Sequence, residues 1–73
     1  MPFYTIDFDQ SRLKVFIQED EVQVKRLKNH VLGHLEGVNY SGLIIYMIEG
    51  NNRFILDDNE IIDNEQILTL EID

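Results

Sequence analysis

Two segments near the start of the chain alternate between apolar and polar residues, which is typical of half-buried strands. They span residues 3–8 and 12–18 and are separated by a short break that suits a turn. Strands this close in sequence pair as an antiparallel hairpin. The alternation places Phe16, and by the same parity Phe3, on the outward face. The inward positions are Tyr4, Ile6 and Phe8 in the first segment and Leu13, Val15 and Ile17 in the second.

The hydrophobic period then lengthens to that of an amphipathic helix of about three to four turns. Asp20, with Gln23 three residues later, has the form of a capping box at its start. Gly37 suits the position just after the helix, whereas Gly33 leaves the end of the helix open between residues 32 and 36. The apolar stripe is formed by Val24, Leu27, Val31 and Leu35.

A continuous apolar run at residues 43–48 predicts a strand near the centre of a sheet. If the helix covers one face of that sheet, alternate residues of the run must point away from the helix. The pattern does not decide which set is open. The two sets are Ile44, Tyr46 and Ile48, or Leu43, Ile45 and Met47.

The rest of the chain predicts a turn at residues 49–52, a short returning strand at 53–56 and a last strand at 67–72. An acidic connection precedes the last strand, and we predict that its apolar pair, Ile61 and Ile62, forms a 3₁₀ turn against the core. The element order is therefore ββαβ(β)β, or ββαββ when the short strand at 53–56 is left out. We expect an α+β fold in which a mixed sheet packs on one helix, as a single domain over residues 1–73.

Composition excludes several classes of protein. A chain of 73 residues has little interior in which to surround a deep active site. It has no cysteine, so disulfides, thiolate metal sites and thiol nucleophiles are excluded. Its longest apolar run is far too short to cross a bilayer, and no basic, apolar leader is present. We expect a cytoplasmic protein that is not inserted in a membrane.

Charge is distributed unevenly along the chain. Residues 1–28 hold equal numbers of acids and bases, whereas residues 29–73 hold Arg53 alone against nine acids, which gives the net charge of −8. This charge repels phosphate backbones, so we expect no nucleic acid partner. The acidic excess suits either a basic partner or simple solubility.

The apolar positions, taken together, make the sequence similar to the ubiquitin-like β-grasp superfamily, and the resemblance covers nearly the whole chain. Two departures bear on function. The chain closes with Glu71-Ile72-Asp73 instead of the Gly-Gly tail of conjugated modifiers, and its last strand points Thr69 and Glu71 outward instead of an apolar patch. The matching positions are Leu13, Val15, Ile17, Val24, Leu27, Val31, Glu36-Gly37-Val38 and Leu68-Thr69-Leu70.

Within the superfamily, the sequence most resembles the small YukD/EsaB-type proteins of bacteria. The resemblance lies in Val24-Lys25-Arg26-Leu27, Val31-Leu32 and Leu35 of the helix and in residues 62–70 at the close. It implies an accessory or regulatory role in type VII (WXG100) secretion without covalent conjugation. Two other hypotheses stay open: a docking domain of a larger eukaryotic protein in the proteasome or deubiquitinase pathway, and a modifier or sulfur carrier that lacks its Gly-Gly tail.

Side chains with possible chemistry form no recognisable active site. His30 and His34 have the i, i+4 spacing of zinc ligands, but no third ligand is fixed by spacing, so we interpret them as surface histidines. The acids of residues 57–65 lack the glycine that calcium loops need, so we interpret them as a solvated loop. Hydroxyls such as Ser41 have no base at a fixed spacing. We therefore expect no enzyme, metal or cofactor.

The remaining candidate function is binding to a protein, by a monomer or a weak homodimer. Apolar side chains that gather on an open sheet face mark an interaction surface. A basic cluster on the helix could in addition contact an acidic partner. The candidate residues are Phe16, Ile44, Tyr46, Ile48 and Thr69 on the sheet and Lys25, Arg26 and Lys28 on the helix.

Overall fold

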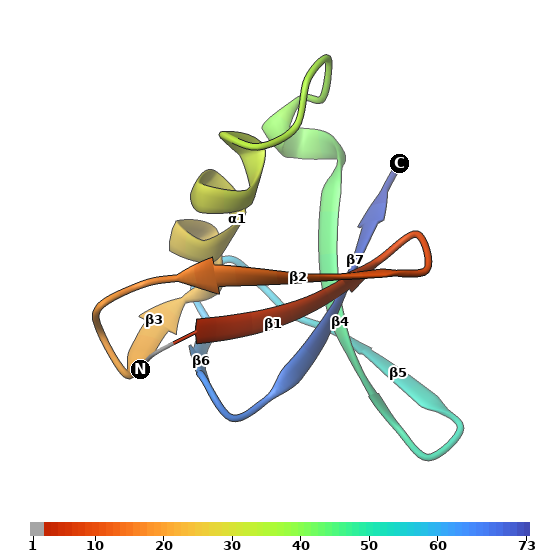
Figure 1. Ribbon diagram of the computed structural model, residues 1–73. Helices are drawn as coiled ribbons and strands as arrows, with labels where there is room; N and C mark the ends of the chain where they lie inside the picture. The colour runs from red at the N-terminus through yellow and green to blue at the C-terminus, as the bar shows by residue number, and fades with distance from the viewer. Residues whose placement is uncertain (1–2) are drawn as a thin grey trace.

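Five strands form one mixed sheet, in the order β2-β1-β7-β4-β5, in the computed structural model, which describes residues 3–73 (Figure 1). β1 and β7 are parallel, and the other neighbours are antiparallel. This topology is a β-grasp (ubiquitin-like) roll of the α+β class, as the sequence predicted. The strands are β1 (Phe3–Phe8), β2 (Ser11–Phe16), β4 (Leu43–Glu49), β5 (Asn52–Ile55) and β7 (Ile67–Ile72).

The helix α1 (Val24–Leu32) begins without the predicted capping box. The residues before it form β3 (Glu21–Gln23), which is extended and pairs with β6 (Ile61–Asp63). The loop before β6 caps the helix instead: the Val24 N–H donates to the Glu60 carbonyl at 2.9 Å, and the Lys25 N–H to the Asp58 carbonyl at 3.0 Å. Backbone acceptors thus satisfy the first free N–H groups of the helix.

The helix also ends earlier than its apolar stripe predicts. Its nine residues stop at Leu32, and Gly33 is the C-cap residue. Leu35 lies past the helix but still packs against the core. Gly37 has a φ of 72° and turns the chain toward η1 (Tyr40–Gly42), a 3₁₀ turn that leads into β4.

Two other expectations are settled by burial. The prediction of a 3₁₀ turn at Ile61 and Ile62 was wrong, because these residues lie in β6 with Ile62 buried and Ile61 exposed. In β4 the inward residues are Leu43 and Ile45, which are buried. The residues that point away from the helix are Ile44 and Tyr46, which are half-buried, and Ile48, which is exposed.

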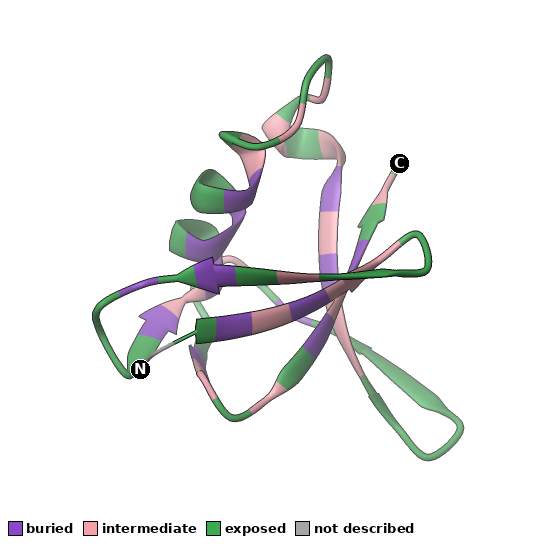
Figure 2. Ribbon diagram, viewed as in Figure 1, coloured by how far each residue is buried: buried purple, intermediate pink, exposed green. Residues whose placement is uncertain are grey.

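The core lies between α1 and the inner face of the sheet (Figure 2). Tyr4 is fully buried in it and donates its hydroxyl proton to the Glu19 carbonyl at 2.8 Å. Burial, reinforced by nearby acids such as Asp20, raises the pKa of Tyr4. The core consists of Tyr4, Ile6, Val15, Ile17, Val22, Val24, Leu27, Val31, Leu43, Ile45, Leu56, Ile62, Leu68 and Leu70.

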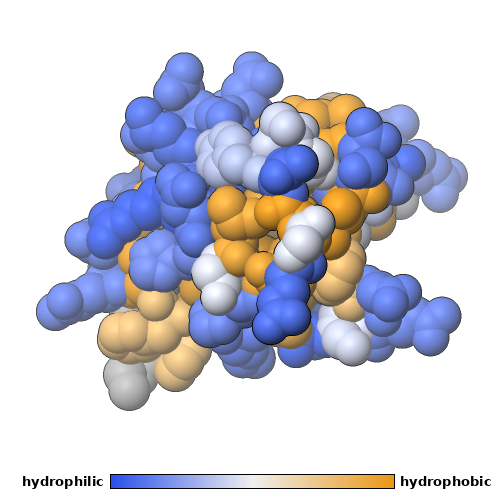
Figure 3. Space-filling view, turned by 90° about the horizontal axis from the view of Figure 1, so that it is seen from above, coloured by the Kyte–Doolittle hydropathy of each residue, from blue (hydrophilic) through white to orange (hydrophobic). Residues whose placement is uncertain are grey.

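Apolar side chains also reach the surface at the end of the roll that is seen from above, where polar side chains frame them (Figure 3). In the described part of the molecule as a whole, partly buried apolar residues of the sheet, the helix and the loop after the helix pack against the core. They are Phe8, Leu13, Leu32, Leu35, Val38, Met47 and Ile72.

Candidate protein-interaction face

The candidate site is the face of the five-stranded sheet that points away from α1, here called the outer sheet face. Its members follow from the register, since residues directly opposite each other on paired strands share a face. They are Phe16, Lys14 and Arg12 of β2, Phe3, Thr5 and Asp7 of β1, Ile67, Thr69 and Glu71 of β7, Ile44, Tyr46 and Ile48 of β4, and Arg53 and Ile55 of β5.

Large apolar side chains are concentrated on this face. Seven of them are exposed among residues 3–73, and five of the seven belong to the outer sheet face. Phe3 and Phe16 lie opposite each other on β1 and β2 with their rings edge to face, 5.5 Å between centroids. The other three are Ile48, Ile55 and Ile67.

Charged side chains on the outer sheet face pair with one another across strands. Arg12 contacts Asp7 at 2.8 Å, and Arg53 contacts Glu71 at 3.0 Å. The hydrogen bond from Arg12 lowers the pKa of Asp7. Arg53 also lies over the ring of Tyr46, 4.2 Å from its centroid, in a cation–π contact. The face is therefore nearly neutral in a chain that carries a net charge of −8.

The structure brings together all the sheet residues that the sequence singled out. Phe16, Ile44, Tyr46, Ile48 and Thr69 lie on the outer sheet face, with Thr69 opposite Tyr46. Sequence reasoning missed Ile55 and Ile67 as site residues. The alternation of β7 already contained the signal for Ile67, whereas β5 is too short to show a period.

The basic cluster predicted on the helix does not form one open surface. Lys25 is exposed, and Arg26 contacts the Glu19 carboxylate at 3.0 Å. Lys28 was wrongly expected on the solvated side, because it is 8% exposed and its ammonium lies 2.7 Å from the Asp58 carboxylate. Lys28 therefore stabilises the fold and is not accessible to a partner.

Asp58 also binds a second group. Its other carboxylate oxygen accepts a hydrogen bond from the Tyr40 hydroxyl at 2.9 Å, and the Lys28 ammonium lies 5.5 Å from the Tyr40 ring centroid. The hydrogen bonds from Lys28 and Tyr40 lower the pKa of Asp58. Burial, helped by Asp58, raises the pKa of Tyr40. The three side chains connect α1, η1 and the loop before β6.

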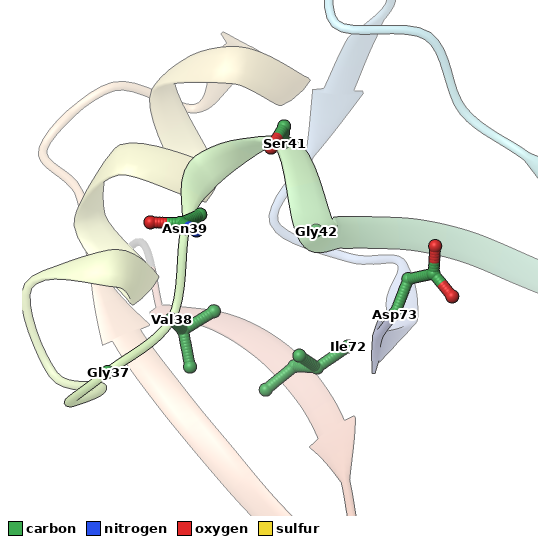
Figure 4. Close-up of a pocket in the computed structure, with 7 residues that line it drawn as sticks. All are labelled: Gly37, Val38, Asn39, Ser41, Gly42, Ile72 and Asp73. Atoms are coloured by element: carbon green, nitrogen blue, oxygen red, sulfur yellow. The ribbon is translucent and has the colours of Figure 1, made fainter.

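A hollow of about 310 Å³ lies beside η1 and the end of β7 (Figure 4). Its lining includes the hydroxyl of Ser41 and the carboxylate of Asp73, which Figure 4 shows apart from each other. No histidine, lysine or arginine lines it. A nucleophile needs an adjacent base, so this lining offers no acid–base pair for catalysis.

Metal-binding side chains are dispersed as well. His30 lies in the last turn of α1, and His34 lies beyond its end. Within residues 3–73, no group of three or more His, Cys, Asp or Glu side chains is placed to hold a metal ion. Across the same residues, α1 is too short and too polar to cross a membrane.

Comparisons with known proteins show the fold. No family model matches the sequence, and no curated protein matches it. The structure is similar to a chain in the crystal structure of ATBAG1 in complex with HSP70, with a TM-score of 0.74 and 13% sequence identity. The match covers 100% of this chain and 41% of that chain, so this chain spans less than half the length of its structural neighbour.

Proposed function

We propose that this chain is a ubiquitin-like protein-interaction module that binds a partner protein through the outer sheet face, with neither catalysis nor conjugation. The observation that carries the proposal is the gathering of Phe3, Phe16, Ile48, Ile55 and Ile67 on that one face. Soluble proteins seldom expose apolar side chains in such concentration unless the surface is used.

The charge arrangement supports the same face. Its acids are already paired with arginines, so a partner that covers the face does not have to neutralise isolated carboxylates. Aromatic side chains and arginine, which Phe3, Phe16, Tyr46 and Arg53 supply, are enriched at protein interfaces.

A more specific form of the proposal is an accessory, cytoplasmic role in type VII (WXG100) secretion. It is supported by the resemblance of the helix and closing segment to YukD/EsaB-type proteins. In the structure, Val24 and Leu27 of that segment are buried, and Lys25 and Arg26 are exposed. The buried pair maintains the fold, and Lys25 is available for contacts, whereas Arg26 already contacts Glu19.

A second candidate is a docking domain within a larger protein. The observation that favours it is the structural neighbour, of which this fold forms less than half, in a complex with HSP70. The third hypothesis, a modifier without its tail, predicts covalent adducts and is separated from the first two by that outcome.

The test is affinity capture of the tagged protein from its own cells, followed by mass spectrometry and a gel for covalent adducts. Ile48→Asp places a charge on the outer sheet face at a residue that is 57% exposed, and Ile61→Asp is the matched control outside that face at 65%. We expect Ile48→Asp to abolish capture and Ile61→Asp to retain it.

The identity of the captured proteins distinguishes the candidates. Secretion components recovered without adducts support the first form, and a covalent ladder contradicts a non-conjugated module. Equal capture by both variants would exclude the outer sheet face.

A further inference from the structure

A groove lies along β5 at the edge of the sheet. Most of its lining comes from the inner side of the sheet, and Ile55 borders it from the outer sheet face. In Figure 1, the hairpin of β4 and β5 extends away from α1, so the helix does not cover its inner side. The groove has a volume of about 310 Å³. It is lined by Met47, Glu49, Phe54, Ile55, Leu56 and Glu60.

The lining combines apolar surface with negative charge. Phe54 lies opposite Met47 and is 45% exposed. Glu49 and Glu60 lie beside this surface, and no lysine, arginine or histidine lines the groove. A cationic group that enters the groove can therefore contact these carboxylates, and no basic side chain of the lining competes with it.

The backbone of β5 offers a second means of binding. β5 is the last strand in the sheet, so its outer edge has no strand partner among residues 3–73. The Leu56 N–H donates to the Ile45 carbonyl of β4 at 2.9 Å. The backbone groups of successive residues in a strand point to opposite edges, so the N–H and C=O groups of Phe54 also point toward β4. Those of Arg53 and Ile55 point outward, to the free edge. An extended segment can pair with these groups.

The two edge strands of the sheet differ in the number of cations that they carry. β2 carries two, Lys14 and Arg12, the second in contact with Asp7, and edge strands are commonly blocked by charged side chains. β5 has the sequence Asn-Arg-Phe-Ile, and the side chain of its one cation, Arg53, contacts Glu71 on the outer sheet face.

We propose that the β5 groove binds an extended segment of another protein in which apolar residues and lysine or arginine share one face, at every second position, because successive side chains of a strand point to opposite faces. The segment adds a strand to β5, its apolar side chains cover Phe54 and Met47, and its cations contact Glu49 and Glu60. A second copy of this chain is a poor occupant, because it carries a net charge of −8 and the one cation of its β5, Arg53, already contacts Glu71.

The test is an NMR titration of the ¹⁵N-labelled protein with a short peptide in which valine and lysine occupy every second position, on one face of the strand, with serine between them. The control peptide has glutamate in place of each lysine. We expect only the lysine peptide to bind, with the largest shifts at the amides of Arg53 and Ile55 and with affinity that falls as salt is raised.

Variants locate the binding. Phe54→Ser should weaken it about tenfold, since aromatic anchors contribute most of the affinity in small interfaces. Phe16→Ser, at a phenylalanine of similar exposure (50%) on the outer sheet face, should leave it unchanged. Glu60→Gln keeps the shape of the groove and should give a smaller loss together with a weaker salt dependence.

Several results would overturn the proposal. They are equal binding of both peptides, no binding of either, shifts centred on β2, or equal losses in Phe54→Ser and Phe16→Ser. Self-association that Phe54→Ser abolishes would assign the groove to a second copy instead.

Discussion

Lys28 and Asp58 form an ion pair in which the lysine is buried and the carboxylate remains partly in water. A buried ammonium without a partner is strongly unfavourable. Lys28 can therefore be buried only when the loop before β6 holds Asp58 next to it. Tyr40 adds a hydrogen bond to the same carboxylate. One side chain from the loop thus fixes both α1 and η1.

The lowered pKa of Asp58 implies a defined dependence of stability on pH. Its contribution is fully present above the pKa of an unfolded aspartate, about 3.9, and is lost as pH falls through the lower folded pKa. We expect Asp58→Asn to lower the free energy of unfolding by about 1–2 kcal/mol at neutral pH. The difference from the wild type should shrink below about pH 4.

Urea unfolding of both proteins across this pH range measures the effect. If the difference in the free energy of unfolding between the two proteins stays constant with pH, the charge of Asp58 does not contribute, and its effect comes from packing or from hydrogen bonds that do not need the charge.

At the scale of elements, the pairing of β3 with β6 is the part of the fold that the sequence did not predict. It closes the roll beneath the helix, and its loop supplies the carbonyls that cap α1. Strands of three residues are too short to show alternation, and their partners lie far apart in the chain. The apolar pair Ile61 and Ile62 was visible in the sequence, but the structure assigned to it was wrong.

The contribution of this small sheet can be measured with the same apolar pair. Ile62 is buried in the core, whereas Ile61 points outward. We expect Ile62→Ala to lower the free energy of unfolding by about 2–4 kcal/mol, and Ile61→Ala by less than about 0.5 kcal/mol. Chemical denaturation of the two variants provides the comparison, and similar losses would show that β6 does not anchor the core as described.

Local signals explain why the rest of the fold was predictable. β1, β2 and β7 each contain enough residues for the apolar alternation to identify an inner face, and this identification also placed Phe16 and Thr69 on the outer sheet face. Lys28 was misplaced because its partner lies thirty residues away in sequence. Burial of a charged group depends on that distant partner, which no periodicity reveals.

At the scale of the whole molecule, the acidic excess lies outside the outer sheet face. The fold holds a net charge of −8 within principal extents of 30 × 29 × 24 Å. Self-repulsion of that charge opposes folding, and it acts over distances comparable to the Debye length in dilute salt. The exposed ion pairs contribute little in return.

We therefore expect the urea midpoint at neutral pH to rise as sodium chloride is added from low concentration, because screening reduces the repulsion. Equilibrium unfolding monitored by circular dichroism at several salt concentrations measures this effect. A fall in the midpoint would mean that the ion pairs on the surface outweigh the net charge.

The placement of β7 also determines when the protein can fold during its synthesis. β7 comes last in the sequence described and yet lies between β1 and β4 in the middle of the sheet. Until Leu68 and Leu70 have left the ribosome, the hairpin of β1 and β2 has no neighbour to join it to β4, and its apolar face stays exposed. This domain should therefore fold in one step, and only after β7 has been synthesised, and its apolar faces stay open to aggregation until then.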